Sequence, residues 1–237
     1  VGNHAVGNLE VVLGEDELAC PSVVLLEHAA CESCCLKYAL HGCTHRIIPD
    51  RIETVTYLAA AAATGGEVTL SGCDPIAVSP VFVPLRQAGC TITVAADRIH
   101  ITAPARMGGL GYIKTLPHPG FPTDAAAPLL AAACVGQGTT VCVETIFANR
   151  YRYVDELARM GAHIRVDGRV AVVEGVPALC GAHVACTDLR GGAALVVAAL
   201  AAQGETRITA LSHLDRGYQD MEECLRRLGA DLARITV

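Results

Sequence analysis

The stretch DRIETVTYLAAAAATGGEVTL, residues 50–70, sets a pattern that returns twice further along the chain. It contains an aspartate, an alanine-rich segment that predicts a helix, a glycine stop and a short β-rich run that predicts a strand. The later copies are DAAAPLLAAACVGQGTTVCV, residues 124–143, and DLRGGAALVVAALAAQGETRIT, residues 188–209. An aspartate before a helix is a common N-cap, so we expect Asp50, Asp124 and Asp188 to cap three equivalent helices.

Each copy continues with a second helix that ends in a matched signature. The signatures are VPLRQAGCTITV, DELARMGAHIRV and EECLRRLGADLARI, in which Gly89, Gly161 and Gly229 hold the position where a left-handed residue ends a helix. A predicted hairpin follows in the first two copies. The order helix, strand, helix, strand, strand predicts an α/β repeat domain over residues 50–237, with the alanine-rich helices inside and the copies around a pseudo-threefold axis.

The composition predicts a soluble globular protein. Of the 237 residues, 52% are hydrophobic, which is ample for a core. Aromatic residues make up only 4%, tryptophan is absent and the net charge is −6, and all three argue against nucleic acid as a partner. The chain has no apolar run of membrane-spanning length, and VGNHAVGNLE at its start lacks the features of a signal peptide. We therefore expect a cytoplasmic location.

The chain contains 12 cysteines, most of which stand singly in apolar segments and are interpreted as small buried hydrophobic residues of a reducing compartment. The exception is a cluster formed by Cys31, Cys34, Cys35 and Cys43 with nearby histidines. Cys31, Cys34, Cys43 and His45 could form a zinc site, but their spacing fits no common zinc finger. We expect no metal, and the sequence leaves this alternative open.

Three arginines are candidates for binding an anion. Arg150 and Arg216 occupy matched positions before the second helices of their copies, and Arg190 lies in the first turn of a predicted helix, where a cation opposes the helix dipole. The planar guanidinium group suits carboxylate and phosphate oxygens. We expect the three to converge at one end of the domain; the alternative is ordinary surface ion pairing, for example between Arg150 and Asp155.

Asp124 differs from the other two capping aspartates because the segment PHPGFPT, residues 117–123, delivers it to its helix. Prolines stiffen this approach and reduce the freedom of the aspartate. A fixed carboxylate beside converging arginines is what a general base for a hydroxyl group requires.

Five motifs of this chain together resemble the UDP-N-acetylglucosamine enolpyruvyl transferase family. They are HRIIPDRIET (45–54), PHPGFPTD (117–124), ETIFANRYRYVDELARMGAH (144–163), GAHVACTDLRGGAALVVAAL (181–200) and HLDRGYQDMEECLRRLGAD (213–231). The motifs are collinear and cover residues 45–237. The related shikimate-pathway enolpyruvyl transferases share the repeat but are far less similar to these strings.

The resemblance implies an enolpyruvyl-transferase-like, inside-out α/β fold of six such units in two globular halves, with the active site in the cleft between them. It implies transfer of the enolpyruvyl group of phosphoenolpyruvate to the 3-hydroxyl of UDP-N-acetylglucosamine, with release of phosphate. This is the first committed step of peptidoglycan synthesis, and the family uses neither a metal nor a cofactor for it.

The resemblance also implies roles for individual residues. By position, Asp124 is the base near the sugar hydroxyl, and Ile146 contacts the UDP-sugar through its backbone. Arg150 and Arg190 hold the pyruvyl carboxylate, and Arg216 faces the phosphate.

Further residues carry supporting roles in the family. Asp188 orients an arginine, and Asp50 and Arg51 belong to the hinge region. The family's first half carries a lysine-asparagine pair and a mobile loop with a proton-donating cysteine, and neither motif occurs here. The segment HGCTHRIIPD is superficially similar to that loop but belongs to the hinge strand, so we expect no catalytic role for Cys43.

Two interpretations of function follow. Residues 1–44 are expected to be a remnant of the N-terminal half, partly folded or irregular, and residues 45–237 an enolpyruvyl transferase C-terminal domain. In the first interpretation the chain is an enzyme whose site is incomplete without the other half. In the alternative it is a non-catalytic remnant or substrate-binding module. The exposed cleft face predicts self-association or a separate N-terminal half as a partner.

Overall fold

A computed structural model describes residues 10–12, 44 and 47–235 of the chain. The helices are α2 (Arg51–Thr64), α3 (Pro75–Gln87), α4 (Thr123–Ala133), α5 (Val154–Arg159), α6 (Leu189–Leu200), α7 (Ser212–Asp215) and α8 (Met221–Arg227). The strands are β1 (Glu10–Val12), β2 (Glu67–Ser71), β3 (Thr91–Val94), β4 (Arg98–Thr102), β5 (Gly111–Lys114), β6 (Thr139–Val143), β7 (His163–Asp167), β8 (Val170–Glu174), β9 (Leu179–Cys180), β10 (His183–Ala185), β11 (Ala202–Gln203) and β12 (Arg207–Thr209).

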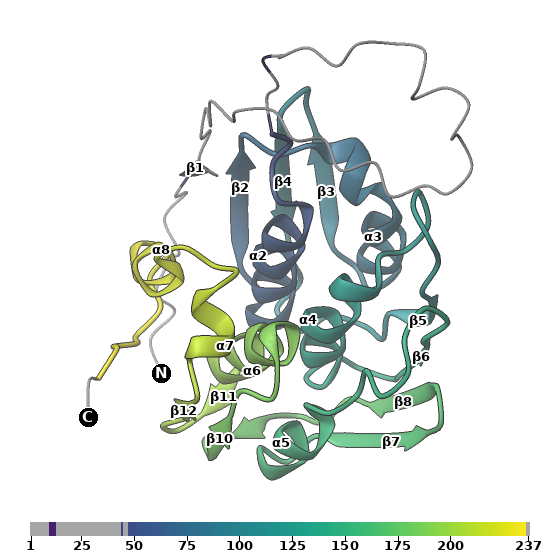
Figure 1. The fold of residues 1–237 in the computed structure, drawn as a ribbon, viewed down its shortest axis with the longest axis vertical. Helices are drawn as coiled ribbons and strands as arrows, with labels where there is room; N and C mark the ends of the chain where they lie inside the picture. The colour runs from purple at the N-terminus through teal and green to yellow at the C-terminus, as the bar shows by residue number, and fades with distance from the viewer. Residues whose placement is uncertain (1–9, 13–43, 45–46, 236–237) are drawn as a thin grey trace, which may run out of the picture.

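The three alanine-rich helices α2, α4 and α6 pack against one another in the middle of the molecule (Figure 1). Their alanines are buried almost throughout, including Ala61, Ala131 and Ala194. Small side chains let helix axes approach closely, and the three helices therefore share one core. The predicted arrangement of the alanine-rich helices inside is confirmed.

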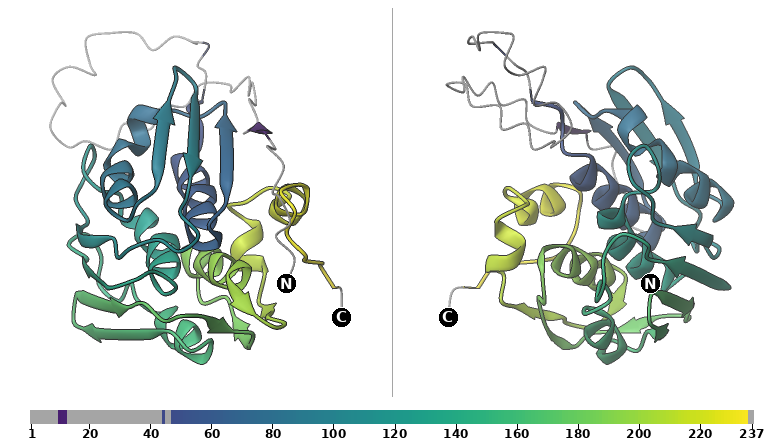
Figure 2. Two further views of the ribbon diagram at one scale, coloured as in Figure 1. Left: turned by 180° about the vertical axis from the view of Figure 1, so that it is seen from behind. Right: turned by 45° about the vertical axis from the view of Figure 1, so that its right-hand side comes forward.

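Two four-stranded sheets cover this helical core. Their strand orders are β1-β2-β4-β3 and β5-β6-β8-β7, and in each the first pair is parallel while the others are antiparallel. The first sheet lies along α2, and α7 and α8 lie on the opposite side of the molecule from it (Figure 2). The sheets form the outside and the long helices the inside, as the resemblance implied.

The third copy departs from the first two. Its strands form two short parallel pairs, β10 with β12 and β9 with β11. Residues 228–235, which follow α8, form no strand in the part of the chain that the structure describes. The hairpin that closes each of the first two copies therefore has no counterpart among these residues.

Each of the second and third copies also contains a strand that the sequence did not predict. β5 and β10 precede the alanine-rich helices and pair in parallel with β6 and β12. The segments GYIK and HVA are too short to show a clear alternation of apolar and polar residues. They become strands because each pairs with a strand that is distant in the sequence.

The predicted glycine stops hold for only some of the helices. Gly65 ends α2 with φ of 66°, and Gly89, Gly161 and Gly229 follow the second helices with φ of 96°, 90° and 97°. The prediction was wrong for α4 and α6, because Cys134 and Ala201 occupy their C-cap positions in right-handed conformation. α4 is followed by turn residues 134–135, and α6 by Ala201 and then directly by β11.

The cysteines that the structure describes are free thiols, and most are buried. Burial raises the pKa of Cys134 to about 12 and that of Cys90 to about 11, as expected for small core residues. The cluster Cys31, Cys34, Cys35 and Cys43 lies outside the described residues. Within the described part of the chain, no three histidine, cysteine or acidic side chains form a group that could hold a metal ion.

None of the helices in the described part of the chain is both long and apolar enough to cross a membrane.

Candidate active site

Asp124 lies in the first turn of α4 and pairs with two arginines instead of capping its helix. The N-cap residue of α4 is Pro122, and no side chain accepts a hydrogen bond from the first amides. The carboxylate of Asp124 contacts Nη2 of Arg150 through one oxygen and Nη2 of Arg190, at 3.4 Å, through the other. The prediction that Asp124 is an N-cap was therefore wrong, because α4 begins one residue before it, at Thr123, and Asp124 is the second residue of the helix.

Asp50 and Asp188 are N-caps, as predicted. Asp50 accepts hydrogen bonds from the amides of Ile52 at 2.7 Å and Glu53 at 3.3 Å. Asp188 accepts one from the amide of Gly191 at 2.8 Å. Of the three aspartates, only Asp124, which follows the proline-rich segment, does not cap a helix, and its carboxylate is therefore available to the site.

The segment that delivers Asp124 is a closed loop. The amide of Leu116 donates to the carbonyl of Phe121 at 2.9 Å, and that of Gly120 to the carbonyl of Pro117 at 2.8 Å. A side chain at Gly120 would meet the Cβ of Leu116 at 2.4 Å, so the closure requires glycine. Phe121 is buried, and the loop is thus anchored at the residue that leads into α4.

Arg150 is held against the site from the loop that follows β6. The preceding residue, Asn149, has a positive φ of 54°, an uncommon conformation that places backbone strain at this position. The guanidinium group of Arg150 stands 5.5 Å from the ring centroid of Phe147, a cation–π distance.

Burial lowers the pKa of Arg150, the charge of Arg190 acts in the same direction, and Asp188 opposes it. The alternative pairing with Asp155 was wrong.

Arg190 is the more buried of the two arginines, with a side chain 15% exposed. Its Nη1 is buried and has no hydrogen-bond partner among the described residues. Buried guanidinium donors are normally satisfied, so an unpartnered one indicates a missing acceptor. Two guanidinium groups meet one carboxylate in ion pairs here, and the unpartnered Nη1 of Arg190 is a donor that an anionic ligand could use.

Arg216 is not brought into contact with this group. It is the C-cap residue of α7 and is exposed, without a hydrogen-bond or ion-pair partner in the described part of the chain. Its neighbour Asp215 pairs with Arg234 at 2.7 Å, whose hydrogen bond lowers the pKa of that carboxyl. Of the three arginines that were expected to converge, the structure brings Arg150 and Arg190 together at Asp124.

The hinge candidates lie at the start of α2, with Asp50 as its N-cap and Arg51 as its first residue. Tyr218 provides a buried connection between this helix and the site. Its hydroxyl lies 2.9 Å from the hydroxyl of Thr56 on α2. Burial raises the pKa of Tyr218, while the hydrogen bond with Thr56 and the charge of Arg190 act against that rise.

The backbone of Ile146, the predicted sugar contact, is held by Glu144, a residue that the sequence analysis missed. The amide of Ile146 donates to the buried carboxylate of Glu144 at 2.7 Å. Thr123, the neighbour of Asp124, donates to the same carboxylate at 2.6 Å. An isolated acid at the end of a strand has no distinctive sequence pattern, and only the contrast between its charge and the apolar run TTVCV before it could have drawn attention to Glu144.

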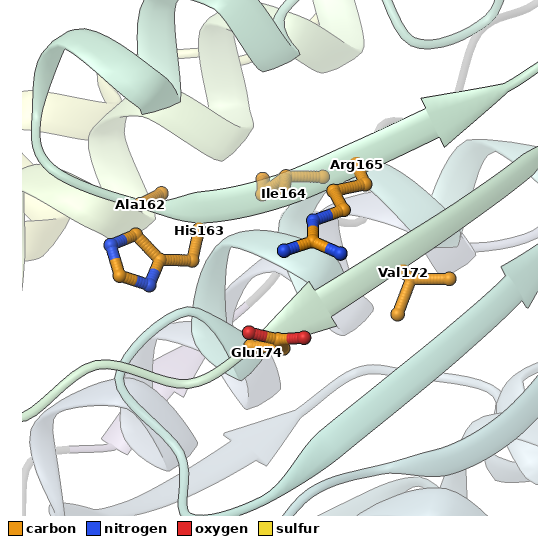
Figure 3. Close-up of a pocket in the computed structure, with 6 residues that line it drawn as sticks. All are labelled: Ala162, His163, Ile164, Arg165, Val172 and Glu174. Carbon is orange, nitrogen blue, oxygen red and sulfur yellow. The ribbon is translucent and has the colours of Figure 1, made fainter.

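A shallow hollow of about 320 Å³ lies elsewhere, on the outer face of β7 and β8 (Figure 3). Its lining includes His163, Arg165 and Glu174, whose side chains are exposed. None of the residues predicted to form the site lines it, and the paired Asp124, Arg150 and Arg190 remain the better candidate for chemistry.

Comparison with known proteins supports an assignment to a family. Residues 36–225 match the family described as EPSP synthase (3-phosphoshikimate 1-carboxyvinyltransferase). The UDP-N-acetylglucosamine 1-carboxyvinyltransferase of Zymomonas mobilis is 51% identical over 196 residues, which are 83% of this chain and 46% of the relative. UDP-N-acetylglucosamine 1-carboxyvinyltransferase 1 of Symbiobacterium thermophilum is 50% identical over 191 residues, 81% of this chain and 43% of the relative. This chain therefore spans less than half the length of these relatives.

Solved structures show the same relationship. The enolpyruvyl transferase NikO from Streptomyces tendae superposes with a TM-score of 0.69 at 29% identity, covering 79% of this chain and 46% of the other. The EPSP synthase from Acinetobacter baumannii gives a TM-score of 0.58 at 18% identity, over 79% of this chain and 48% of that one. The second likeness concerns the fold alone.

Proposed function

This chain belongs to the EPSP synthase (3-phosphoshikimate 1-carboxyvinyltransferase) family, and we propose that it supplies one half of a UDP-N-acetylglucosamine 1-carboxyvinyltransferase. The reaction would transfer the enolpyruvyl group of phosphoenolpyruvate to the 3-hydroxyl of UDP-N-acetylglucosamine. We further propose that this takes place in the cytoplasm, as part of peptidoglycan synthesis. The proposal rests on relatives at about half sequence identity that carry this name.

The observation that carries the proposal is the pairing of one carboxylate with two arginines. Arg150 and Arg190 both contact Asp124, and Arg190 has a buried donor left over. The carboxylate of phosphoenolpyruvate offers two acceptor oxygens, which match the fork of a guanidinium group. When this substrate anion takes the place of Asp124 on the arginines, the aspartate becomes free to face a substrate hydroxyl.

The chemistry then balances as an addition followed by an elimination. Asp124 accepts the proton of the sugar 3-hydroxyl while the oxygen attacks C2 of phosphoenolpyruvate and C3 gains a proton. The tetrahedral intermediate then loses one proton of its C3 methyl group to the proton donor, now acting as a base, or to water. The C2–O bond to phosphate breaks at the same time, which releases inorganic phosphate and leaves the enol ether. In this scheme Arg150 and Arg190 hold the carboxylate throughout and Arg216 meets the phosphate. The donor of the C3 proton belongs to the family motif that this chain lacks.

A second candidate is a substrate-binding module without turnover. Its support is that Arg150 and Arg190 could hold an anion without any proton donor, and the family places its site between two halves. In both cases the site surface is the same, and residues 45–237 form the domain that carries it. The partner would be a separate N-terminal half or a second copy of the chain.

The test is a measurement of phosphate release from phosphoenolpyruvate and UDP-N-acetylglucosamine by the 237-residue chain. Asp124→Asn should abolish any turnover, while Asp167→Asn, which changes an exposed aspartate at the end of β7, should leave it unchanged. Calorimetric titration with UDP-N-acetylglucosamine should be carried out in parallel. Binding without turnover supports the module, and absence of both would contradict each form of the proposal.

A further inference from the structure

Glu144 is a buried carboxylate directly after β6. Its exposed fraction is 1%. Burying an ionised carboxylate is costly unless hydrogen bonds replace the lost water, so a residue of this kind indicates a specific set of donors.

Four donors surround its two carboxylate oxygens. Oε1 accepts hydrogen bonds from the Thr115 hydroxyl at 2.9 Å and from the amides of Ile146 at 2.7 Å and Phe147 at 3.1 Å. Oε2 accepts one from the Thr123 hydroxyl at 2.6 Å. All four groups are donors in these contacts, which is the complement of an ionised carboxylate, a group that only accepts.

The donors come from segments that carry different parts of the candidate site. Thr123 precedes Asp124 in the chain, and Ile146 and Phe147 begin the loop that leads to Arg150. The Phe147 ring also packs against the Arg150 guanidinium group. The Glu144 carboxylate thus accepts hydrogen bonds both from the residue before the proposed base and from the loop that carries the proposed sugar contact.

A second set of hydrogen bonds joins Thr145 to Thr115, next to Glu144. The amide of Thr145 donates to the Thr115 hydroxyl at 2.8 Å, and the Thr145 hydroxyl donates to the Thr115 carbonyl. The Thr115 hydroxyl in turn donates to Glu144. A chain of hydrogen bonds therefore runs from the end of β5 through Glu144 to the start of α4.

We propose that Glu144 is a positioning residue. It couples the loop that leads to Asp124 with the loop from Ile146 to Arg150, and so fixes the position of the base relative to the backbone that contacts the sugar. The inference deepens the proposed function and rests on it for the identity of the ligand. It also assigns a polarity to the contact at Ile146. Because the Ile146 amide is committed to Glu144, only its carbonyl oxygen is left for a ligand, and it must meet an N–H or O–H group of the sugar.

The test uses two kinds of variant in the 237-residue chain. Glu144→Gln keeps the size but removes the negative charge, so the hydrogen bonds from its donors are no longer charge-assisted. Glu174→Gln is the control, because Glu174 is an exposed carboxylate at the end of β8. Thr123→Val removes one donor without changing volume, and Thr123→Ser restores the hydroxyl. Calorimetry measures the affinity for UDP-N-acetylglucosamine, and amide hydrogen exchange reports on the two loops.

We expect Glu144→Gln and Thr123→Val to weaken the affinity about tenfold or more. Glu144→Gln weakens hydrogen bonds to a buried charged group, and Thr123→Val leaves Oε2 of Glu144 unpaired. Thr123→Ser and Glu174→Gln should bind as the wild type does, and all variants should unfold cooperatively. Thr123→Val should also speed exchange at the amides of Ile146 and Phe147, which Thr123 does not contact. A merely local role for Thr123 would leave those amides unchanged.

The outcomes separate the inference from the proposed function. If the wild type binds and both Glu144→Gln and Thr123→Val bind equally well, the coupling is wrong and the proposed function stands. If the wild type does not bind the UDP-sugar, the proposed function fails, and hydrogen exchange decides the coupling alone. If the faster exchange in Thr123→Val stayed within residues 116–124, the proposed coupling would be overturned. Faster exchange that also reached residues 146–147 would support the coupling.

Discussion

The carboxylate of Asp124 pairs with the guanidinium group of Arg150, although Asp124 belongs to α4 and Arg150 to the loop that follows β6. The N-cap residue of α4 is Pro122, so the first amides of this helix have no side-chain cap. A missing N-cap typically costs about 0.5–2 kcal/mol, so α4 lacks local stability at the end that presents Asp124 to the arginines. Asp50 and Asp188, which have no such partner, keep the capping role.

Replacing this aspartate should have opposite effects on anion binding and on turnover. Asp124→Asn removes the internal anion that competes for Arg150 and Arg190, so phosphoenolpyruvate should bind up to about fivefold more tightly, the scale of one partly exposed ion pair. Turnover, if the chain has any, should be lost. Calorimetric titration with phosphoenolpyruvate, with Asp167→Asn as control, measures the first effect. Weaker binding in Asp124→Asn would show that the carboxylate organises the arginines instead of competing with a substrate.

The fork geometry of Arg190 should matter beyond its charge. Arg190→Lys keeps the positive charge but cannot offer two parallel donors, so we expect phosphoenolpyruvate to bind about tenfold more weakly. Arg165→Lys, on the exposed face of β7, is the matched control and should have no effect. The same titration serves as the measurement. Equal affinity in Arg190→Lys would mean that the unpartnered Nη1 of Arg190 does not meet the substrate.

The repeat could be predicted from the sequence because its signals are local. An alanine-rich run before a β-rich run is visible in any one copy, and the recurrence of the pattern at Asp50, Asp124 and Asp188 made it specific. The strands β5 and β10 were missed because their short segments become strands only through pairing with β6 and β12.

The site was predictable to the extent that charge and position suggest it. Arg150, Arg190 and Asp124 were identified as candidates, and they do meet. Their detailed roles depend on distances that no local pattern records, which is why Asp124 was expected to cap α4. Glu144 escaped notice for the same reason, because its four donors come from residues 115–147 and gather only in the folded chain.

Glu53, in the first turn of α2, should make stability depend on pH. Burial and the charge of Asp50 raise its pKa from 4.5 to about 7. A raised pKa in the folded state means that the contribution of Glu53 to stability is complete below pH 4.5 and is lost as the pH rises through about 7. Glu53→Gln mimics the neutral form, so this variant should lose less stability than the wild type between pH 5 and pH 8.

Thermal unfolding of both proteins across that pH range measures the difference. Glu174→Gln is the control, because it removes one negative charge from an exposed strand end. Parallel curves for the wild type and Glu53→Gln would contradict the prediction.

The central helices should tolerate no larger side chains where they meet. Ala194 on α6 is fully buried, whereas Ala199 on the same helix is only half-buried. Ala194→Leu forces extra methylene groups into a close-packed core and should lower the free energy of unfolding by about 1–3 kcal/mol. Ala199→Leu should cost well under half as much. Urea denaturation checks both, since an altered midpoint with an unchanged slope reports a change in stability alone. Equal costs at the two positions would mean that the helix contacts relax as easily as the surface does, and that small residues are not what fixes the packing of α2, α4 and α6.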